Sequence, residues 1–418
     1  MIQRNLLTPL REHLSAPEIT VITGPRQAGK TTLMRLLQKE LAHAGLETLF
    51  FDLDFEADAQ YFRSQLRLIE KIRLELGNQR GVVFIDEIQR KENASLFLKG
   101  IYDQKLPFKF VVSGSGSMAL KAKIQESLAG RKRLFELKSV TFEEFVNFKT
   151  QYRYVHKLHE FMALEKDRLD LLLEEYMNFG GYPRIVTETR RSEKRHLMDE
   201  IFRSYVERDI VYLLGIDRPD VFISLVKLLS VQIGRHLKYT QLATHLGISV
   251  PTVKKYLWLI EKTFVIDRVV PFFRNPKKEI TKAPEIYFHD LGLCNYAAGQ
   301  FGAGRNRPDS GFLFQNFVYQ LVRDQLRLSD WDIRFWRTTD KAEVDLILIR
   351  PMETIPVEVK FMDIKQKTIQ RSLRTFIKKY HPQRAFVVNL SLEGSVMVDD
   401  TKVFFLPYHK LYAALCDL

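Results

Sequence analysis

The sequence predicts a multidomain α/β protein, in which a parallel-sheet domain precedes a helical linker, a winged helix-turn-helix and a second α/β domain. The chain has 418 residues, which is too long for a single hydrophobic core. Strands and helices alternate over the first 150 residues, as is typical of a mainly parallel sheet with helices on its faces. The pattern then turns helical and rich in charge, and strands return near residue 283. We therefore expect domain boundaries that give residues 1–150, 151–217, 218–282 and 283–418.

Composition limits the classes of protein that the chain can belong to. Hydrophobic residues make up 45% and charged residues 28%, as in an ordinary soluble globular protein. The net charge of +13 favours an anionic partner, with nucleic acid ahead of a membrane surface. Cys294 and Cys416 are too few for a disulfide framework or a cysteine zinc site, so we expect a cytoplasmic protein. The N-terminus lacks an apolar signal region and no uncharged run approaches 18 residues, which predicts no membrane span.

The first chemical signature is Gly-x-x-x-x-Gly-Lys-Thr between an apolar strand at residues 18–23 and a helix at 33–44. This is the sequence context of a phosphate-binding P-loop, in which backbone amide hydrogens surround phosphate oxygens at a helix N-terminus. Lys30 is expected to reach the β- and γ-phosphates of ATP, and the Thr31 hydroxyl to bind Mg²⁺. The residues expected to bind the nucleotide are Gly24, Pro25, Arg26, Gln27, Ala28, Gly29, Lys30, Thr31 and Thr32.

The second signature is the apolar run Val82-Val83-Phe84-Ile85 that ends in Asp86 and Glu87. It describes a buried strand whose carboxyl end presents two acids where open α/β sheets bind ligands. Asp86 suits the magnesium shell and Glu87 suits the base that polarises the attacking water. The distance of about 55 residues from Lys30 favours this assignment over an ordinary strand end.

Two further side chains are candidates for the same site. The strand at 108–113 runs into a serine-glycine turn, and Ser113 or Ser115 could contact the γ-phosphate or the water, although a plain flexible turn explains the composition equally well. Arg131 could stabilise transition-state charge in its own subunit or in a neighbour's site. In the second case the protein would be a homo-oligomer. Arg208, in the basic run of the helical linker, is the other candidate for this arginine.

Residues 218–282 are typical of a winged helix-turn-helix. A first helix near 239–246 ends at Gly247, and Ser249 caps a second helix over 250–262. In a DNA-binding interpretation the second helix, with Thr252, Lys254 and Lys255, enters the major groove. Lid or protein-docking modules share this pattern, so that interpretation stays open. The cations expected to meet phosphates in the wing are Arg268, Arg274, Lys277 and Lys278.

The last domain combines a strand at 286–290 and an amphipathic helix over 311–328 with three short strands, a basic helix at about 365–380 and a strand at 385–389. Strand alternation places Glu358 and Lys360 on one face, and the hairpin brings Asp345 beside them. Two carboxylates and a lysine at a strand tip can hold a divalent metal and orient a water for phosphodiester hydrolysis. Considered without reference to any known family, these residues are better explained as solvated charges on a hairpin.

Over nearly its whole length the chain resembles the prokaryotic ATPases that join an AAA-type P-loop domain to a C-terminal domain of unknown function, DUF4143. The P-loop and the Asp86-Glu87 strand carry the first part of the resemblance. The motifs that carry the rest are Leu128-Ala129-Gly130-Arg131, Gly180-Gly181-Tyr182-Pro183, Tyr205-Val206-Glu207-Arg208-Asp209-Ile210, Ile286-Tyr287-Phe288-His289-Asp290-Leu291-Gly292-Leu293, Ala342-Glu343-Val344-Asp345 and Pro356-Val357-Glu358-Val359-Lys360.

The resemblance implies ATP and Mg²⁺ as cofactors, a sensor role near Ser113, and a C-terminal domain similar to restriction endonucleases. In that fold Asp345 and Glu358 match metal ligands and Lys360 the group that orients water. Members of the family often have a glutamate where this chain has Gln315, and a neutral amide is a poorer metal ligand. Nuclease turnover is therefore in doubt, whereas DNA binding is compatible with the substitution.

These features predict a Mg²⁺-dependent ATPase that couples its nucleotide state to a DNA-engaging module. One alternative is a nucleotide-dependent switch or scaffold that binds protein partners and hydrolyses ATP slowly. A second alternative is a metal-dependent nuclease gated by ATP.

Overall fold

The first 150 residues form a five-stranded parallel sheet in the computed structural model, which describes residues 1–115, 128–204, 216, 218–273, 283–304, 307–327 and 329–416. The strand order is β2-β3-β4-β1-β5, so β4 separates β1, which precedes the P-loop, from β3, which carries the two acids. The four predicted strands are confirmed, and β5 is an additional edge strand. The strands are β1 (Ile19–Gly24), β2 (Glu47–Asp52), β3 (Gly81–Asp86), β4 (Phe108–Ser115) and β5 (Lys132–Glu136).

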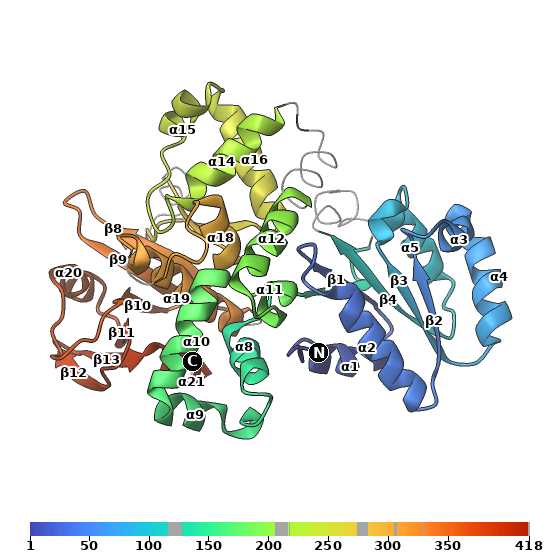
Figure 1. The fold of residues 1–418 in the computed structure, drawn as a ribbon, viewed down its shortest axis with the longest axis horizontal. Helices are drawn as coiled ribbons and strands as arrows, with labels where there is room; N and C mark the ends of the chain where they lie inside the picture. Colours follow the sequence, from blue (N-terminus) through green and yellow to red (C-terminus); the bar gives the residue numbers. More distant parts are fainter. Residues whose placement is uncertain are drawn as a thin grey trace.

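Helices cover both faces of this sheet because alternate residues of the buried strands point to opposite sides. Val82 and Phe84 pack with Leu33 of the helix after the P-loop, whereas Val83 and Ile85 pack on the other face. The helices are α1 (Leu7–Glu12), α2 (Lys30–His43), α3 (Glu56–Ala59), α4 (Gln65–Leu76) and α5 (Ala94–Asp103). Figure 1 shows this layered domain on one side of the molecule and the remaining elements on the other.

A helical layer lies between the two halves of the molecule. The helices of this layer are α8 (Phe142–Lys149), α9 (Leu158–Leu164), α10 (Lys166–Phe179), α11 (Pro183–Thr187) and α12 (Arg191–Phe202). Three helices and an antiparallel pair of strands follow. These are α14 (Pro219–Ser230), α15 (Tyr239–Leu246), α16 (Val250–Lys262), β6 (Ile266–Val269) and β7 (Glu285–Phe288).

The C-terminal part is a six-stranded mixed sheet of order β12-β13-β11-β10-β9-β8. The strands β8, β9 and β10 are antiparallel, and β10 pairs in parallel with β11. The predicted sequence of helix, three strands, helix and strand is confirmed at the level of these elements. They are α18 (Leu291–Ala297), α19 (Ser310–Leu326), β8 (Asp332–Arg337), β9 (Glu343–Arg350), β10 (Glu353–Val359), α20 (Arg371–Tyr380), β11 (Arg384–Asn389), β12 (Gly394–Val398), β13 (Thr401–Pro407) and α21 (Tyr408–Cys416).

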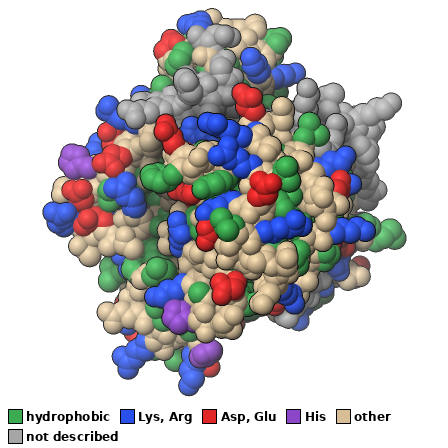
Figure 2. Space-filling view, turned by 90° about the vertical axis from the view of Figure 1, so that its right-hand side faces the viewer, with side chains coloured by type: hydrophobic (Ala, Val, Ile, Leu, Met, Phe, Trp, Pro, Cys, Tyr) green, Lys and Arg blue, Asp and Glu red, His purple; other side chains and the backbone are tan. Residues whose placement is uncertain are grey.

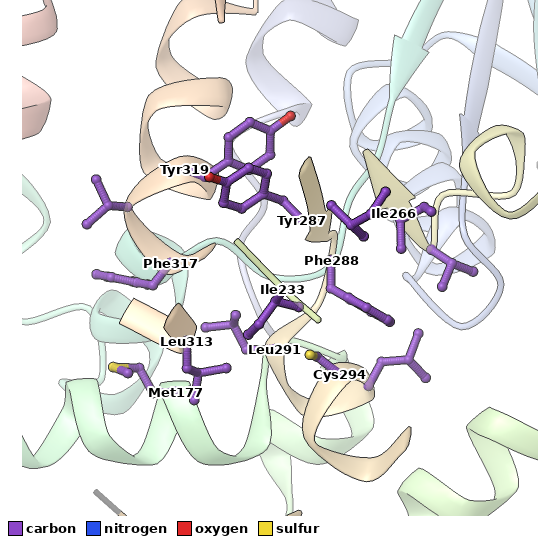
Figure 3. Packing of buried hydrophobic residues seen from close by; sticks show 14 of the residues in the cluster. Met177, Ile233, Ile266, Tyr287, Phe288, Leu291, Cys294, Leu313, Phe317 and Tyr319 are labelled. Carbon is purple, nitrogen blue, oxygen red and sulfur yellow. The ribbon is translucent and has the colours of Figure 1, made fainter. Parts of the chain in front are cut away.

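One hydrophobic cluster joins the helical layer, the three-helix segment and the C-terminal sheet. Figure 3 shows Met177, Ile233, Leu291 and Phe317, which come from separate parts of the sequence, around the same centre. Tyr287 on β7 stacks on Tyr319 of α19, with 4.3 Å between ring centroids. The segments predicted as three domains after residue 150 therefore share a core, whereas the parallel sheet has clusters of its own.

Candidate nucleotide site

The P-loop is shaped by two glycines with positive φ. Gly24 has φ +148°, and a Cβ at this position would meet the carbonyl oxygen of Leu137, the residue after β5, at 2.0 Å. Gly29 has φ +94° and is the N-cap of α2, which begins at Lys30. Only glycine adopts these conformations without strain. The predicted turn from strand to loop to helix is thus present, with the N-terminus of α2 open toward a phosphate.

Lys30 is folded over the loop. Its Nζ donates to the carbonyl oxygens of Gly24 at 3.1 Å and of Pro25 at 2.8 Å, and the residue is only 5% exposed. Thr31 and Thr32 follow on the exposed first turn of α2. The ammonium group is therefore already held at the mouth of the loop, where the phosphates of a nucleotide would lie.

The sheet brings Asp86, Glu87 and Ser113 together at its carboxyl edge. Ile22 on β1 pairs with Ser113 on β4, and β4 in turn pairs with β3. The Ser113 hydroxyl donates to Asp86 Oδ1, which also accepts the backbone N–H of Glu87 at 3.1 Å. The predicted association of these three residues is therefore present, and Asp86 is fully buried by it.

Glu87 has an unusual backbone and an unusual electrostatic environment. Its φ of +54° is rare for a residue with a side chain and is found at sites that the surrounding structure enforces. Burial raises the pKa of its carboxyl group, the nearby charge of Lys30 lowers it, and the charge of Asp86 raises it further. Gln89 donates to Glu87 Oε2. The net effect is a carboxyl group that accepts a proton more readily than an ordinary glutamate.

Lys30, Thr31 and Glu87 line a cavity of about 410 Å³, which lies in the size range of small-molecule sites. The helical layer closes it on the side away from the sheet. Gln27 Nε2 donates to Ser204 Oγ at 3.1 Å, and Pro183 Cγ lies 3.9 Å from the position of a Cβ on Gly29. The lining residues are Arg26, Gln27, Gly29, Lys30, Thr31, Thr32, Asp54, Glu87, Pro183, Arg184 and Ser204.

Arg131 lies elsewhere in the domain. It precedes β5 at the amino edge of the parallel sheet, whereas the P-loop is at the carboxyl edge. Its Nε is 2.8 Å from Asp103 Oδ1 at the end of α5. The structure therefore does not bring Arg131 to the nucleotide cavity of its own chain. Arg208 and the side chain of Ser115 lie outside the described residues.

Sequence reasoning missed two arginines that touch this site. Arg4, on the segment before α1, donates to the carbonyl oxygens of Ala28 at 2.9 Å and Lys138 at 2.7 Å, and pairs with Glu144. Arg184, the second residue of α11, lines the cavity and pairs with Glu200 at 3.0 Å. Arg4 has no local sequence signal, but the position of Arg184 directly after the Gly-Gly-Tyr-Pro motif could have identified it.

The Gly180-Gly181-Tyr182-Pro183 motif and the motif that contains Asp290 contact each other beside the cavity. Asp290 accepts the backbone N–H of Gly181 at 2.8 Å through Oδ2 and that of Leu293 at 2.9 Å through Oδ1. A Cβ on Gly180 would lie 2.3 Å from Asp290 Oδ1, and one on Gly292 would lie 2.0 Å from the Phe179 carbonyl oxygen. These glycines allow the α10–α11 turn to approach α18 and thereby fix the position of Pro183 and Arg184.

The C-terminal candidates also meet. Val359 N donates to Asp345 Oδ2 at 2.6 Å, and Lys360 Nζ is 2.7 Å from Glu358 Oε1. Burial and the charge of Glu358 raise the pKa of the Asp345 carboxyl group, which is the direction expected for two acids in one site. Within the described ranges, no group of three acidic, histidine or cysteine side chains has the spacing of a metal site.

Gln315 is connected through hydrogen bonds to a further buried acid, Glu285. Its Nε2 donates to Tyr287 Oη at 2.8 Å, and that hydroxyl donates to Glu285 Oε2 at 3.0 Å. Burial and the charges of Glu343 and Asp345 raise the pKa of Glu285 well above its usual value. The amide of Gln315 is therefore held in a hydrogen-bonded chain that ends at a buried acid.

The candidate DNA-contacting residues on α16 are on the surface. Lys254 and Lys255 are exposed, and Thr252 follows the Ser249 cap, which accepts its N–H at 3.3 Å. Arg268 on β6 is paired with Glu261 of α16, with Nε 2.9 Å from Oε2. Arg274, Lys277 and Lys278 lie outside the described residues. None of the described helices has the length and apolar character that a bilayer crossing needs.

Comparison with known proteins gives three family matches. Residues 16–146 match "AAA domain", residues 310–411 match "Domain of unknown function (DUF4143)" and residues 170–303 match "Domain of unknown function (DUF8612)". An uncharacterized protein of Mycobacterium tuberculosis is 27% identical over 391 residues, which are 92% of this chain and 79% of the relative. An uncharacterized protein of Methanocaldococcus jannaschii is 29% identical over 195 residues, 46% of this chain and 42% of the relative.

Among solved structures, AMPPCP-bound DnaA from Aquifex aeolicus is 14% identical, with 62% of this chain and 86% of DnaA covered and a TM-score of 0.29. DnaA bound to AMPPCP and single-stranded DNA is 16% identical, with 63% and 90% covered and a TM-score of 0.31. These likenesses are too distant to support a function. The N-terminal sheet and its family match indicate nucleotide binding and hydrolysis, usually with Mg²⁺. The chain joins an AAA-type P-loop ATPase domain to a C-terminal DUF4143 domain.

Proposed function

We propose that the protein is a Mg²⁺-dependent ATPase whose nucleotide state controls a DNA-engaging module. One observation carries this proposal. The P-loop, Glu87 and the start of α11 line a single cavity of about 410 Å³ although they come from distant parts of the sequence, and Asp86 and Ser113 are hydrogen-bonded directly behind Glu87. A nucleotide in this cavity would touch the sheet domain and the helical layer at once.

The residues of the loop would bind the phosphates through backbone amide hydrogens and through Lys30, whose Nζ would exchange its two carbonyl acceptors for phosphate oxygens. Thr31 and Asp86 offer hydroxyl and carboxylate oxygens, the hard donors that Mg²⁺ prefers. Bound there, Mg²⁺ would neutralise phosphate charge. These donors fit the ion, because Asp86 is held in place by Ser113 and by the Glu87 amide.

Glu87 would accept the proton of the attacking water. Its raised pKa makes the carboxylate a better base than a solvated glutamate, and its N–H lies 3.3 Å from Ser113 Oγ, which fixes the two relative to each other. Two arginines of this chain line the cavity, Arg26 of the loop and Arg184 of the helical layer, and Arg184 is the one that would approach the nucleotide from the side opposite the sheet. Arg131 lies at the edge of the sheet opposite the nucleotide cavity of its own chain. In this proposal it therefore acts only on the cavity of a neighbouring subunit, in a homo-oligomer.

The DNA-engaging module would comprise the winged helix formed by α14, α15, α16 and the β6–β7 hairpin, together with the C-terminal sheet. The order of three helices and a hairpin supports the first assignment. The helix α19, the antiparallel strands β8, β9 and β10, the helix α20 and the parallel strand β11 support a restriction-endonuclease-like assignment for the second. Lys254 and Lys255 on α16 would contact DNA.

The test is an ATPase assay with and without duplex or single-stranded DNA at low salt. We expect Mg²⁺-dependent turnover that DNA changes and that Lys30→Ala abolishes. Turnover that survives Lys30→Ala would contradict the catalytic assignment. DNA that neither binds nor alters turnover would contradict the nucleic-acid half of the proposal.

A second candidate function, an ATP-gated nuclease, is favoured by the contacts among Asp345, Glu358 and Lys360. Its test is Mg²⁺- or Mn²⁺-dependent DNA cleavage that Glu358→Ala abolishes. Gln315→Glu is the informative companion variant, because it restores the acid that family members often carry at this position. Cleavage that is insensitive to Glu358→Ala would come from a contaminant and would rule this function out.

A further inference from the structure

Helix α20 presents charge of a single sign to solvent. Its ten residues, Arg371 to Tyr380, include no aspartate or glutamate. Leu373, Phe376 and Ile377 are buried against the C-terminal sheet, so the apolar side of the helix is fully used in packing. The outward side, which we call the α20 basic face, consists of the exposed cations Arg371, Arg374, Lys378 and Lys379.

The spacing of these cations forms a stripe. At 100° per residue, Arg371, Arg374 and Lys378 fall within about 60° of one another and opposite the buried residues. They span about 10 Å along the axis, at about 1.5 Å per residue. Phosphates of one DNA strand repeat about every 3.4 Å along the duplex axis, so the stripe covers about three of them. Lys365 and Lys367, both exposed, extend the positive surface before the helix.

These cations have no carboxylate partners in the described part of the chain. Nearby ion pairs use other residues, such as Arg350 with Glu353 and Lys410 with Glu393. Ordinary surface helices of this protein mix the two signs. On α4, Arg67, Lys71 and Arg73 are interspersed with Glu70 and Glu75, and Lys71 pairs with Glu75. Figure 2 shows the same mixture of blue and red side chains on the side of the molecule that it presents.

We propose that the α20 basic face binds the sugar-phosphate backbone of a nucleic acid. Cations without anionic neighbours remain available to release counterions from a polyphosphate. The outward face has no apolar side chain that could enter a lipid headgroup layer, which a membrane-bound helix needs. The helix packs on β9 and β10, the strands that carry Asp345 and Glu358. A nucleic-acid backbone bound to α20 would therefore pass beside these two acids.

This inference deepens the proposed function and rests on its DNA-engaging half, but it assigns the contact to a surface distinct from α16. The test variant combines Arg371→Gln, Arg374→Gln and Lys378→Gln. A matched control removes three exposed cations from the sheet domain, through Lys39→Gln, Arg67→Gln and Arg73→Gln. Both variants lose three positive charges, and thermal unfolding verifies that both are folded. A third variant, Lys254→Gln with Lys255→Gln, reports on α16.

The measurement is fluorescence anisotropy of a labelled duplex of mixed sequence across a salt series. We expect the α20 variant to bind about 100-fold more weakly at about 0.1 M salt, with the slope of log K against log salt reduced by about 2.7. The control should bind like the wild type. Equal losses in both variants would show an effect of net charge alone and would overturn the proposal.

The α16 variant, the wild type and lipid vesicles distinguish the remaining outcomes. Wild-type affinity in the α20 variant, with a loss in the α16 variant, would contradict this inference while leaving the proposed function intact. No binding of DNA by the wild type would contradict both. Vesicles rich in phosphatidylserine are the competing probe, and binding to them that requires α20, without any binding to duplex, would replace nucleic acid with a membrane surface.

Discussion

Lys138 Nζ lies 2.5 Å from Asp324 Oδ1, and this ion pair connects the sheet domain to α19 of the C-terminal half. Lys138 directly follows Leu137, whose carbonyl oxygen leaves room only for a glycine at position 24 of the P-loop. The neighbour of Asp324, Arg323, pairs with Asp267 on β6. Burial would raise the pKa of Asp324, but Lys138 and Arg323 outweigh it and lower the pKa. A continuous set of ion pairs therefore runs from Lys138, which follows the residue packed on the P-loop, to the proposed wing.

Lys138→Met should uncouple these two halves. We expect ATPase turnover without DNA to stay within about twofold of the wild type and the response to DNA to be lost. The stability cost should be about 1 to 3 kcal/mol, because Asp324 loses its short ion pair and keeps only the longer contact with Arg323. Lys138→Asp combined with Asp324→Lys should recover part of the response. Arg11→Met, which removes an exposed pair with Glu40, is the control. An unchanged DNA response in Lys138→Met would show that the pair only holds the halves together.

Lys30→Ala should weaken ATP hydrolysis by at least roughly 100-fold, because the ammonium group is the buried cation at the mouth of the loop. The measurement is phosphate release together with binding of a fluorescent ATP analogue. Lys39→Ala, an exposed lysine on the same helix, is the control and should leave both unchanged.

Glu87→Gln should retain ATP binding and lose about 100- to 10,000-fold in turnover, which is the usual contribution of a general base to the rate. The pH profile of the wild type gives an independent check. Only the deprotonated carboxylate accepts a proton, so burial, by raising the pKa, moves the acidic limb of turnover to a higher pH than an ordinary glutamate would give. The variant should lack that limb. A wild-type profile whose acidic limb persists in Glu87→Gln would assign the base to another group.

When variant chains are mixed with wild-type chains, the turnover of the mixture should depend differently on Arg184→Ala and on Arg131→Ala. Arg184 lines the cavity of its own chain, so its loss should reduce turnover in proportion to the variant chains present. Arg131 lies at the opposite sheet edge, paired with Asp103, and its loss should matter only if subunits assemble. Turnover measured against the fraction of variant chains, with light scattering for assembly, separates the two. Full activity of Arg184→Ala would remove that arginine from the mechanism.

Asp290→Ala should destabilise the fold by about 3 kcal/mol, because it removes a buried acceptor from two backbone N–H groups. The free energy of unfolding in urea measures this loss. Asp340→Ala, at an exposed position, should change it by less than about 0.5 kcal/mol. Since Asp290 holds the α10–α11 turn, ATP affinity should fall as well. An unchanged ATP affinity in Asp290→Ala would show that the turn does not position the cavity.

Sequence alone was sufficient for the features that depend on neighbouring residues. The P-loop is set by glycines and a lysine within eight positions, and the Asp86-Glu87 tip by an apolar run that must be buried. The alternation of strands and helices then predicts that the sheet is mainly parallel, whereas the order of its strands came from the structure. The helix and strands around Asp345, Glu358 and Lys360 were predictable for the same reason, since each is defined by local periodicity.

The tertiary structure decided which distant residues meet. Pro183, Arg184 and Ser204 reach the P-loop only because α10 and α18 pack through glycines that permit contact at backbone distance. Arg4 contacts both Ala28 of the loop and Lys138, and Asp324 contacts Lys138 from the C-terminal half of the chain, and no local pattern encodes such contacts. Arg131 shows the converse, because a residue in a family motif can lie at the far edge of the sheet. Local patterns specify elements, whereas contacts between elements are decided by how their buried surfaces fit together.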